Sequence, residues 1–179
     1  MADKIRWGII STANIARGAV IPAIKASRNG VVYAVASRDL SRARSFADEL
    51  GIEHAYGSYE ELLSDPNVDA VYNPLPNDGH APWSIAAAKA KKPTLCEKPL
   101  ALDAAEAWEL VEAFRAEDVL LAEAFMYRYH PQHQTAKELI ANGTLGKVSI
   151  ITATFTYSMS FDEQVNVRLK PAMGGGGLL

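Results

Sequence analysis

Residues 5–15 read Ile-Arg-Trp-Gly-Ile-Ile-Ser-Thr-Ala-Asn-Ile, the pattern of a strand followed by a tight turn and the start of a helix. Residues 5–10 form a short apolar run of the kind that makes a buried strand. Gly8, Ser11 and Ala13 stand where a dinucleotide-binding turn usually carries three glycines. Small side chains there let backbone N–H groups approach a pyrophosphate, and the positive end of the following helix adds to the attraction. The alternative is an ordinary tight turn between a strand and a helix.

Strand and helix patterns alternate up to about residue 125. Further strands are predicted at residues 31–37, near Tyr56, and at residues 69–73, 94–96 and 119–122. Strands that alternate with helices at this spacing indicate right-handed strand–helix–strand units. The predicted fold class is therefore α/β, with a doubly wound parallel sheet.

The helices between these strands have recognisable ends. Residues 40–50 keep apolar side chains at helical spacing, and Gly51 is placed to end that helix. The first helix is expected to break near Pro22, because proline lacks a backbone donor. Two pairs of residues match the capping box, namely Ser58 with Glu61 and Asp103 with Glu106.

The pattern changes after the sixth predicted strand. Residues 131–141 can form one helix that ends at Asn142-Gly143, and residues 148–157 then alternate as a long strand. One long alternating strand fits an antiparallel sheet better than another parallel unit. We therefore place a domain boundary near residue 125, with residues 1–125 as the first domain and residues 126–179 as the start of a second.

Composition excludes several classes of protein. The chain has 179 residues, of which 49% are hydrophobic and 22% charged, so it is neither a disordered nor a collagen-like chain. Its formal net charge of −3 gives no basic excess for nucleic acid. No apolar stretch approaches a membrane span, the N-terminus has no apolar leader, and a single cysteine forms no disulfide framework. We expect a cytoplasmic protein with neither a membrane nor a nucleic acid as partner.

The end of the second strand distinguishes between nicotinamide cofactors. An acidic residue there would bind the ribose 2′-hydroxyl of NAD, whereas a hydroxyl and an arginine can hold the 2′-phosphate of NADP. This chain has Ser37 and Arg38, with Arg42 one turn further on, so NADP is favoured over NAD. Asp39 either opposes the phosphate or caps the helix. The alternative for the two arginines is a solvated basic helix start.

Lys98 is the candidate catalytic residue. It follows a buried strand, between Glu97 and Pro99, where an ammonium group can polarise an oxygen or share a proton. The alternative is a surface lysine neutralised by Glu97. A cis bond between Lys98 and Pro99 is an option for this turn.

Other polar residues are weaker candidates. The stiff segment 73–77, together with His80, would either wall the nicotinamide ribose or serve only as a rigid turn. No metal is expected, because His130 and His133 have no cysteine or carboxylate at ligand spacing. Cys96 lies on a buried strand and is expected to pack rather than react. A covalent mechanism through Ser11 has no partnered base.

Four motifs together resemble the glucose–fructose oxidoreductase/inositol dehydrogenase (Gfo/Idh/MocA) family. They are the segments 7–16, Ala36-Ser37-Arg38, Glu97-Lys98-Pro99 and 124–131. The Ser-Thr-Ala form of the turn is similar to that of the NADP-dependent xylose dehydrogenase and trans-dihydrobenzenediol dehydrogenase branch. The resemblance implies a Rossmann domain followed by an α/β domain whose open, mainly antiparallel sheet binds substrate and mediates homo-oligomerisation.

The resemblance also implies an activity and roles for individual residues. Hydride would pass between nicotinamide C4 and a carbon of a sugar, cyclitol or diol, which is the small-molecule substrate. Lys98 would contact the reacting oxygen and the nicotinamide ribose, and Arg128 would line the nicotinamide end. The turn, the strand ends and the resemblance together give a cofactor-binding set of Gly8, Ile10, Ser11, Thr12, Ala13, Asn14, Ile15, Ser37, Arg38, Arg42, Asn73, Pro74, Leu75, Pro76, Asn77, His80, Glu97, Lys98 and Arg128.

The C-terminal end qualifies the expected activity. The family usually continues after the Gly-Gly-Gly-Leu-Leu stretch into a motif that supplies acid/base residues, and this chain stops at Leu179. We expect a front portion that binds cofactor but turns over little by itself. Two rival interpretations stay open. One is a catalytically silent NADP-binding sensor or scaffold. The other is a flavodoxin-like mononucleotide-binding or signalling domain, although this chain lacks the carboxylate cluster expected at the strand ends of such a domain.

Overall fold

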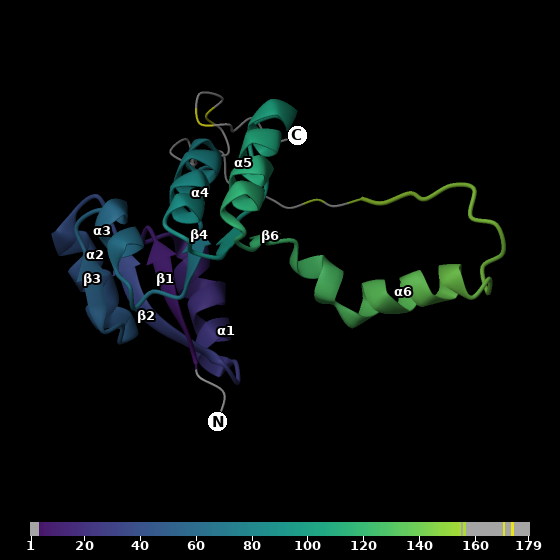
Figure 1. Ribbon diagram of the computed structural model, residues 1–179. Coiled ribbons are helices and arrows are strands. Elements are labelled where there is room, and N and C mark those ends of the chain that lie inside the picture. Colours follow the sequence, from purple (N-terminus) through teal and green to yellow (C-terminus); the bar gives the residue numbers. More distant parts are fainter. Residues whose placement is uncertain (1–3, 155, 157–169, 171–172, 174–179) are drawn as a thin grey trace.

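The computed structural model describes residues 4–154, 156, 170 and 173. Its centre is one sheet of six parallel strands in the order β3-β2-β1-β4-β5-β6 (Figure 1). The strands are β1 (Ile5–Ile10), β2 (Gly30–Ala36), β3 (His54–Tyr56), β4 (Ala70–Asn73), β5 (Thr94–Cys96) and β6 (Leu121–Glu123). The chain reverses direction across the sheet between β3 and β4, so the switch point lies beside β1. The predicted doubly wound parallel sheet is confirmed.

Helices cover both faces of this sheet. They are η1 (Ala16–Val20), α1 (Ile21–Ala26), α2 (Leu40–Leu50), α3 (Tyr59–Ser64), η2 (Asn77–Gly79), α4 (His80–Lys89) and α5 (Ala104–Glu117). One core cluster joins α1 and α2 to the sheet, and a second joins α3 and α4 to the opposite face. Helix α5 packs against α4 in a third cluster that includes Leu110 and Phe114 (Figure 1).

The β1–β2 pairing contains a β-bulge. Trp7 pairs with Val32, but the next residue, Gly8, pairs with Ala34, so Tyr33 is the extra residue of β2. The extra residue changes the alternation of the strand. Val32 and Val35 therefore both pack into the core on the α1 side.

The predicted helix ends are confirmed at α2, α3 and α5. Gly51 ends α2 in the left-handed conformation, with a φ of 60°. Ser58 accepts a hydrogen bond from Glu61 N at 3.1 Å, and Asp103 accepts one from Glu106 N at 2.9 Å. In return, each glutamate carboxylate accepts a hydrogen bond from the backbone N–H of the residue before the cap: Glu61 from Gly57 N and Glu106 from Leu102 N.

The regular α-helical geometry of the first helix is interrupted before Pro22, as predicted. The helix does not end there but continues through a wider, π-helical turn. Residues 14–26 are helical throughout, and residues 16–20 have π-helical geometry. Ile21 N–H bonds to Ala16 O, five residues back. A proline at the start of α1 needs no backbone donor, so this wide turn lets the helix continue.

Helix α4 lacks the signals that reveal helices in a sequence, and no prediction covers it. Its buried residues lie on more than one side, because α3 packs against one side and α5 against the other. An apolar segment buried in this way has no polar stripe that would mark a helical period. Pro82 near its start also reads as a helix breaker in the sequence.

Beyond β6 the chain leaves the sheet. The short helix η3 (Met126–Tyr129) leads into α6 (Pro131–Ala141), which extends away from the sheet (Figure 1). The predicted helix at 131–141 is confirmed, and Gly143 follows its end with a φ of 77°. None of the helices in the described part of the chain combines the length and the apolar character that crossing a bilayer requires.

The predicted strand at 148–157 is wrong for the part of it that the structure describes. Residues 148–154 and 156 form no strand, and residues 155 and 157 lie outside the described residues. An alternating sequence needs a hydrogen-bonded neighbour before it becomes a strand. Among the described residues, no segment pairs with this one.

Candidate functional site

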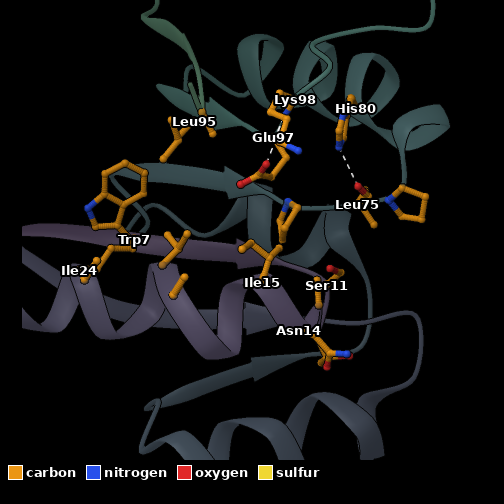
Figure 2. Close-up of a pocket in the computed structure, with 18 of the residues that line it drawn as sticks. Trp7, Ser11, Asn14, Ile15, Ile24, Leu75, His80, Leu95, Glu97 and Lys98 are labelled. Atoms are coloured by element: carbon orange, nitrogen blue, oxygen red, sulfur yellow. Dashed lines mark hydrogen bonds between the residues drawn. The ribbon is translucent and has the colours of Figure 1, made fainter. Parts of the chain in front are cut away.

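A large cavity opens at the carboxyl ends of the parallel strands, where ligands bind in this class of fold. Its volume is about 1440 Å³, which includes a continuation past Trp7, Ile24 and Leu95 (Figure 2). The loops after β1, β2, β4, β5 and β6 all contribute side chains to it. Figure 2 shows Ser11, Asn14 and Ile15 on one side of the cavity and Glu97, Lys98 and His80 on the other.

The turn after β1 has the backbone of a phosphate-binding loop. Ser11 has a φ of 77°, in the region that favours glycine, and its N–H donates to Ala36 O at 2.9 Å. Thr12, Ala13, Asn14 and Ile15 follow it along the cavity wall. The helix that begins here leaves its first N–H groups without acceptors inside the helix. This turn therefore offers donors and a small surface to an anion.

Ser11 also carries an unsatisfied polar atom. Its Oγ is buried and has no hydrogen-bond partner among the described residues. A buried hydroxyl without a partner is unfavourable unless a ligand atom completes its hydrogen bonding. Because Ser11 lines the cavity, this hydroxyl fits a phosphate oxygen.

Two members of the predicted cofactor-binding set do not line the cavity at this turn. Gly8 lies inside β1 rather than at its end, and Ile10 is fully buried. A Cβ at Gly8 would lie 2.8 Å from Leu62 Cδ2 and 2.9 Å from Val68 Cγ1. The glycine therefore lets α3 and the following loop approach β1, which is a packing role.

The end of β2 places Ser37, Arg38 and Arg42 on the cavity wall, together with Asp39. Asp39 caps α2, since its Oδ1 accepts from Ser41 N at 2.8 Å, Ser41 Oγ at 2.7 Å and Arg42 N at 3.4 Å. These bonds lower the pKa of its carboxyl group. Neither Arg38 nor Arg42 forms an ion pair within the described residues. Two guanidinium groups are thus available to an anion there.

Tyr59 is a wall residue at this end that sequence reasoning missed. Its ring packs edge-on against Trp83, with 4.7 Å between centroids. Burial raises the pKa of its hydroxyl, while the charges of Arg38 and Arg42 and a hydrogen bond with Arg38 act in the opposite direction. Its position directly after the cap of α3, beyond the third strand, is the signal that could have identified it.

Glu97 and Lys98 line the cavity after β5. Tyr72 on β4, which the sequence did not single out, donates its hydroxyl to Glu97 Oε1 at 2.8 Å. Lys98 N donates to Glu97 Oε2 at 3.3 Å, so the carboxylate is bound on both oxygens. The Lys98 side chain is exposed, and the Lys98–Pro99 peptide bond is cis. Burial and the Glu97 carboxylate both raise the pKa of Tyr72.

Residues at and after the end of β4 have two kinds of position: some line the cavity, and others are buried behind the cavity wall. Residues 74–77 line the cavity. Asn73 is fully buried, and its side chain bonds to Leu75 N, Gly79 O, His80 O and Ser84 Oγ. The amide therefore uses its hydrogen-bonding capacity inside the protein.

The region after β6 differs most from the sequence-based set. Arg128 is exposed and does not line the cavity, whereas Glu123, Ala124, Phe125, Met126 and Tyr129 do. The pKa of Glu123 is raised, mainly by burial. The sequence singles out segment 124–131 only as part of the family resemblance, which assigns Arg128 rather than its neighbours to the cavity.

Cysteine and histidine chemistry contributes little here. Cys96 is fully buried, and burial raises the pKa of its thiol to about 12, so it packs as predicted. His130 caps α6 by accepting from Gln132 N at 3.2 Å. Across the described residues, no three His, Cys, Asp or Glu side chains gather as metal ligands.

These features fit an extended dinucleotide. The cavity is lined by the turn at 11–15, by Arg38 and Arg42 after β2, and by Lys98 after β5. The buried Ser11 hydroxyl supplies a donor that lacks a protein partner among the described residues.

Two family models match the chain. The GFO_IDH_MocA model, described as an oxidoreductase family with an NAD-binding Rossmann fold, matches residues 5–125. The GFO_IDH_MocA_C3 model, described as a GFO/IDH/MocA C-terminal domain, matches residues 133–179.

Named relatives include sugar and diol dehydrogenases. A D-xylose 1-dehydrogenase (NADP(+)) of Haloferax volcanii is 46% identical over 173 residues, covering 97% of this chain and 52% of the relative. Mouse trans-1,2-dihydrobenzene-1,2-diol dehydrogenase is 38% identical over 177 residues, covering 98% and 52%. The chain thus spans about half the length of the curated relatives it matches.

Solved structures agree with the fold. The 3-ketoreductase KijD10 from Actinomadura kijaniata, in complex with NADP, superposes with a TM-score of 0.74 and 39% identity, covering 81% of this chain and 46% of that one. A probable dehydrogenase from Thermotoga maritima gives a TM-score of 0.74 and 36% identity, covering 79% and 42%.

Proposed function

The chain belongs to the Gfo/Idh/MocA oxidoreductase family, and from this membership we propose that it is the NADP-binding part of an enzyme that transfers hydride. The substrate class is a sugar, cyclitol or diol, in which a CH–OH group is oxidised or a carbonyl group reduced. Support comes from the relatives, which include an NADP-dependent xylose dehydrogenase and a dihydrodiol dehydrogenase.

One observation carries the cofactor assignment. A single cavity contains the turn at 11–15, the pair Arg38 and Arg42, and Lys98. An arginine pair at the end of β2 suits the 2′-phosphate of NADP, whereas NAD would require an acidic side chain free to bind its ribose. The acidic residue present there, Asp39, is engaged in capping α2.

The residues of the cavity then have distinct tasks. Residues 11–15 would bind the pyrophosphate through backbone N–H groups, and the Ser11 hydroxyl would gain its missing partner. When bound, NADPH would supply a hydride from nicotinamide C4 to a carbonyl carbon, and NADP+ would accept one at C4 from a CH–OH carbon. Lys98 would donate a hydrogen bond to the oxygen on the reacting carbon, which stabilises negative charge there. Glu97, held by Tyr72, would keep the neighbouring wall in place.

The remaining organisation is part of the same proposal. Residues 1–125 form the NADP-binding domain, and residues 126–179 begin a domain that binds substrate and assembles the protein into a homo-oligomer. The match of residues 133–179 to a C-terminal domain model supports this division. A cytoplasmic location is consistent with the single buried free cysteine.

A binding titration tests the cofactor proposal. We expect NADPH to bind more tightly than NADH, with Arg38→Ala raising the Kd for NADPH at least about tenfold, equivalent to about 1.4 kcal/mol, and leaving the Kd for NADH unchanged. Arg44→Ala is the matched control, because Arg44 is also exposed on α2 but lies outside the cavity. Equal affinity for both cofactors would refute the NADP assignment.

A second variant separates an enzyme from a silent sensor. In the whole enzyme of which this chain is proposed to be the NADP-binding part, Lys98→Ala should lower the rate of NADP reduction with a panel of aldoses, cyclitols and diols by about a hundredfold or more. The NADPH Kd should change by less than about fivefold. Lys89→Ala, on the exposed side of α4, should match the wild type. NADPH binding without turnover of any substrate by the whole wild-type enzyme would instead favour the sensor.

A further inference from the structure

His80 occupies an unusual position between the two loops that frame one end of the cavity. It begins α4 and is 1% exposed. Its Nδ1 lies 2.6 Å from Pro99 O. Its Nε2 lies 2.7 Å from Leu75 O (Figure 2). The ring therefore bridges the segment after β4 and the segment that carries Lys98.

The chemistry of these contacts fixes the number of protons on the ring. A carbonyl oxygen only accepts hydrogen bonds, so each ring nitrogen must donate to make its contact. A neutral imidazole has one N–H and would direct a lone pair at the other carbonyl at hydrogen-bond distance. Both contacts are favourable only when the ring is an imidazolium ion.

The surroundings both oppose and favour such a charge. Burial and the positive end of α4 oppose it. Charged groups on the neighbouring described segments are Glu123 on β6, Asp78 in η2, and Glu97 and Lys98 after β5. The His80 ring is close enough to Glu123 to lower the pKa of that carboxyl group, although burial raises it overall. Two carbonyl dipoles and one nearby carboxylate are therefore available to stabilise the imidazolium ion.

We propose that His80 is a positioning residue that acts as a buried cation, and that its two N–H groups tie the cavity wall at Leu75 to the Lys98–Pro99 turn. Both ring nitrogens are engaged inside the protein, so His80 does not donate to a cofactor. Its effect on binding acts through the spacing of the two loops. The link to NADPH rests on the proposed function, but the protonation state does not.

Nitrogen NMR of the imidazole rings tests the protonation state directly. The chain has four histidines, so a two-bond ¹H–¹⁵N spectrum is simple, and His80→Gln identifies the His80 signals. At about pH 7.5, where exposed imidazoles are mostly neutral, we expect both His80 nitrogens to show imidazolium shifts. One nitrogen with the shift of an unprotonated ring atom would overturn the proposal. This test uses the wild-type chain, so it holds even where the variant does not fold.

The NADPH affinity tests the positioning role. His80→Gln should raise the NADPH Kd about tenfold, and the control His133→Gln, on exposed α6, should leave it unchanged. An NADPH Kd for His80→Gln equal to that of the wild type would refute the positioning role while leaving NADP binding itself intact.

Discussion

Asp39 serves the fold and faces the cavity at the same time. Its carboxylate caps α2 through Ser41 and Arg42, yet its negative charge lies on the wall that also presents Arg38. An asparagine is as good a cap as aspartate, but it carries no charge. The two roles of this residue can therefore be separated by one substitution.

We predict that Asp39→Asn binds NADPH about threefold more tightly than the wild type and leaves the Tm unchanged. The tighter binding follows from the removal of a like charge near the phosphate, and the unchanged Tm follows from the retained cap. Fluorescence titration and a thermal melt measure the two effects. Asp48→Asn, on α2 outside the cavity, is the control, and weaker NADPH binding by Asp39→Asn would contradict the prediction.

At the scale of single residues, the sequence predicted the polar residues that line the cavity better than the buried residues that hold the cavity wall in place. Ser37, Arg38 and Lys98 can be found because they follow strands directly. Asn73 is the last residue of β4 and His80 the first of α4, and the polar atoms of both side chains are hydrogen-bonded inside the protein. Which way a side chain points after a strand depends on tertiary packing, and a single sequence does not encode that in a local pattern.

At the level of elements, the helix caps are the most local signals and were predicted correctly. Ser58 and Asp103 satisfy N–H groups of their own helices, so neighbouring residues suffice to identify them. Helix α4 and the segment 148–154 depend instead on what packs beside them. Helix α4 is buried on several sides, so its sequence shows no helical alternation of apolar and polar residues. Segment 148–154 has no paired strand among the described residues.

We predict that Ser58→Ala destabilises the protein by about 1 kcal/mol, because Glu61 N loses its acceptor at the start of α3. Urea unfolding should show a lower midpoint with an unchanged slope. Ser45→Ala on the exposed side of α2 is the matched control and should be neutral or slightly stabilising. A midpoint for Ser58→Ala equal to that of Ser45→Ala would show that this cap contributes no stability.

For the whole molecule, acidic groups set the response to pH. A hydrogen bond from Arg6 lowers the pKa of Asp69. Burial opposes ionisation of Asp65, but hydrogen bonds from Tyr56 and Asn67 lower its pKa on balance. A carboxyl group with a lowered native pKa contributes stability above its unfolded pKa and loses it as the pH falls through the native value.

We therefore predict a urea midpoint that changes little between about pH 7 and pH 5 and falls steeply below about pH 4, where unfolded aspartates become protonated. Circular dichroism across this range measures it. Asp69→Asn should lower the midpoint at neutral pH and reduce the loss in acid, since the Arg6 partner is gone. A midpoint that rises on acidification would have the wrong sign for these groups.

The buried thiol of Cys96 has a practical consequence for following ligand binding in solution. The chain has one cysteine, it is fully buried, and its thiol pKa is about 12, so maleimide reagents meet almost no native thiolate. Arg44→Cys would then accept a single environment-sensitive dye at an exposed position of α2, two residues after Arg42. Spectroscopic labelling at one chosen point is therefore available without first removing any cysteine.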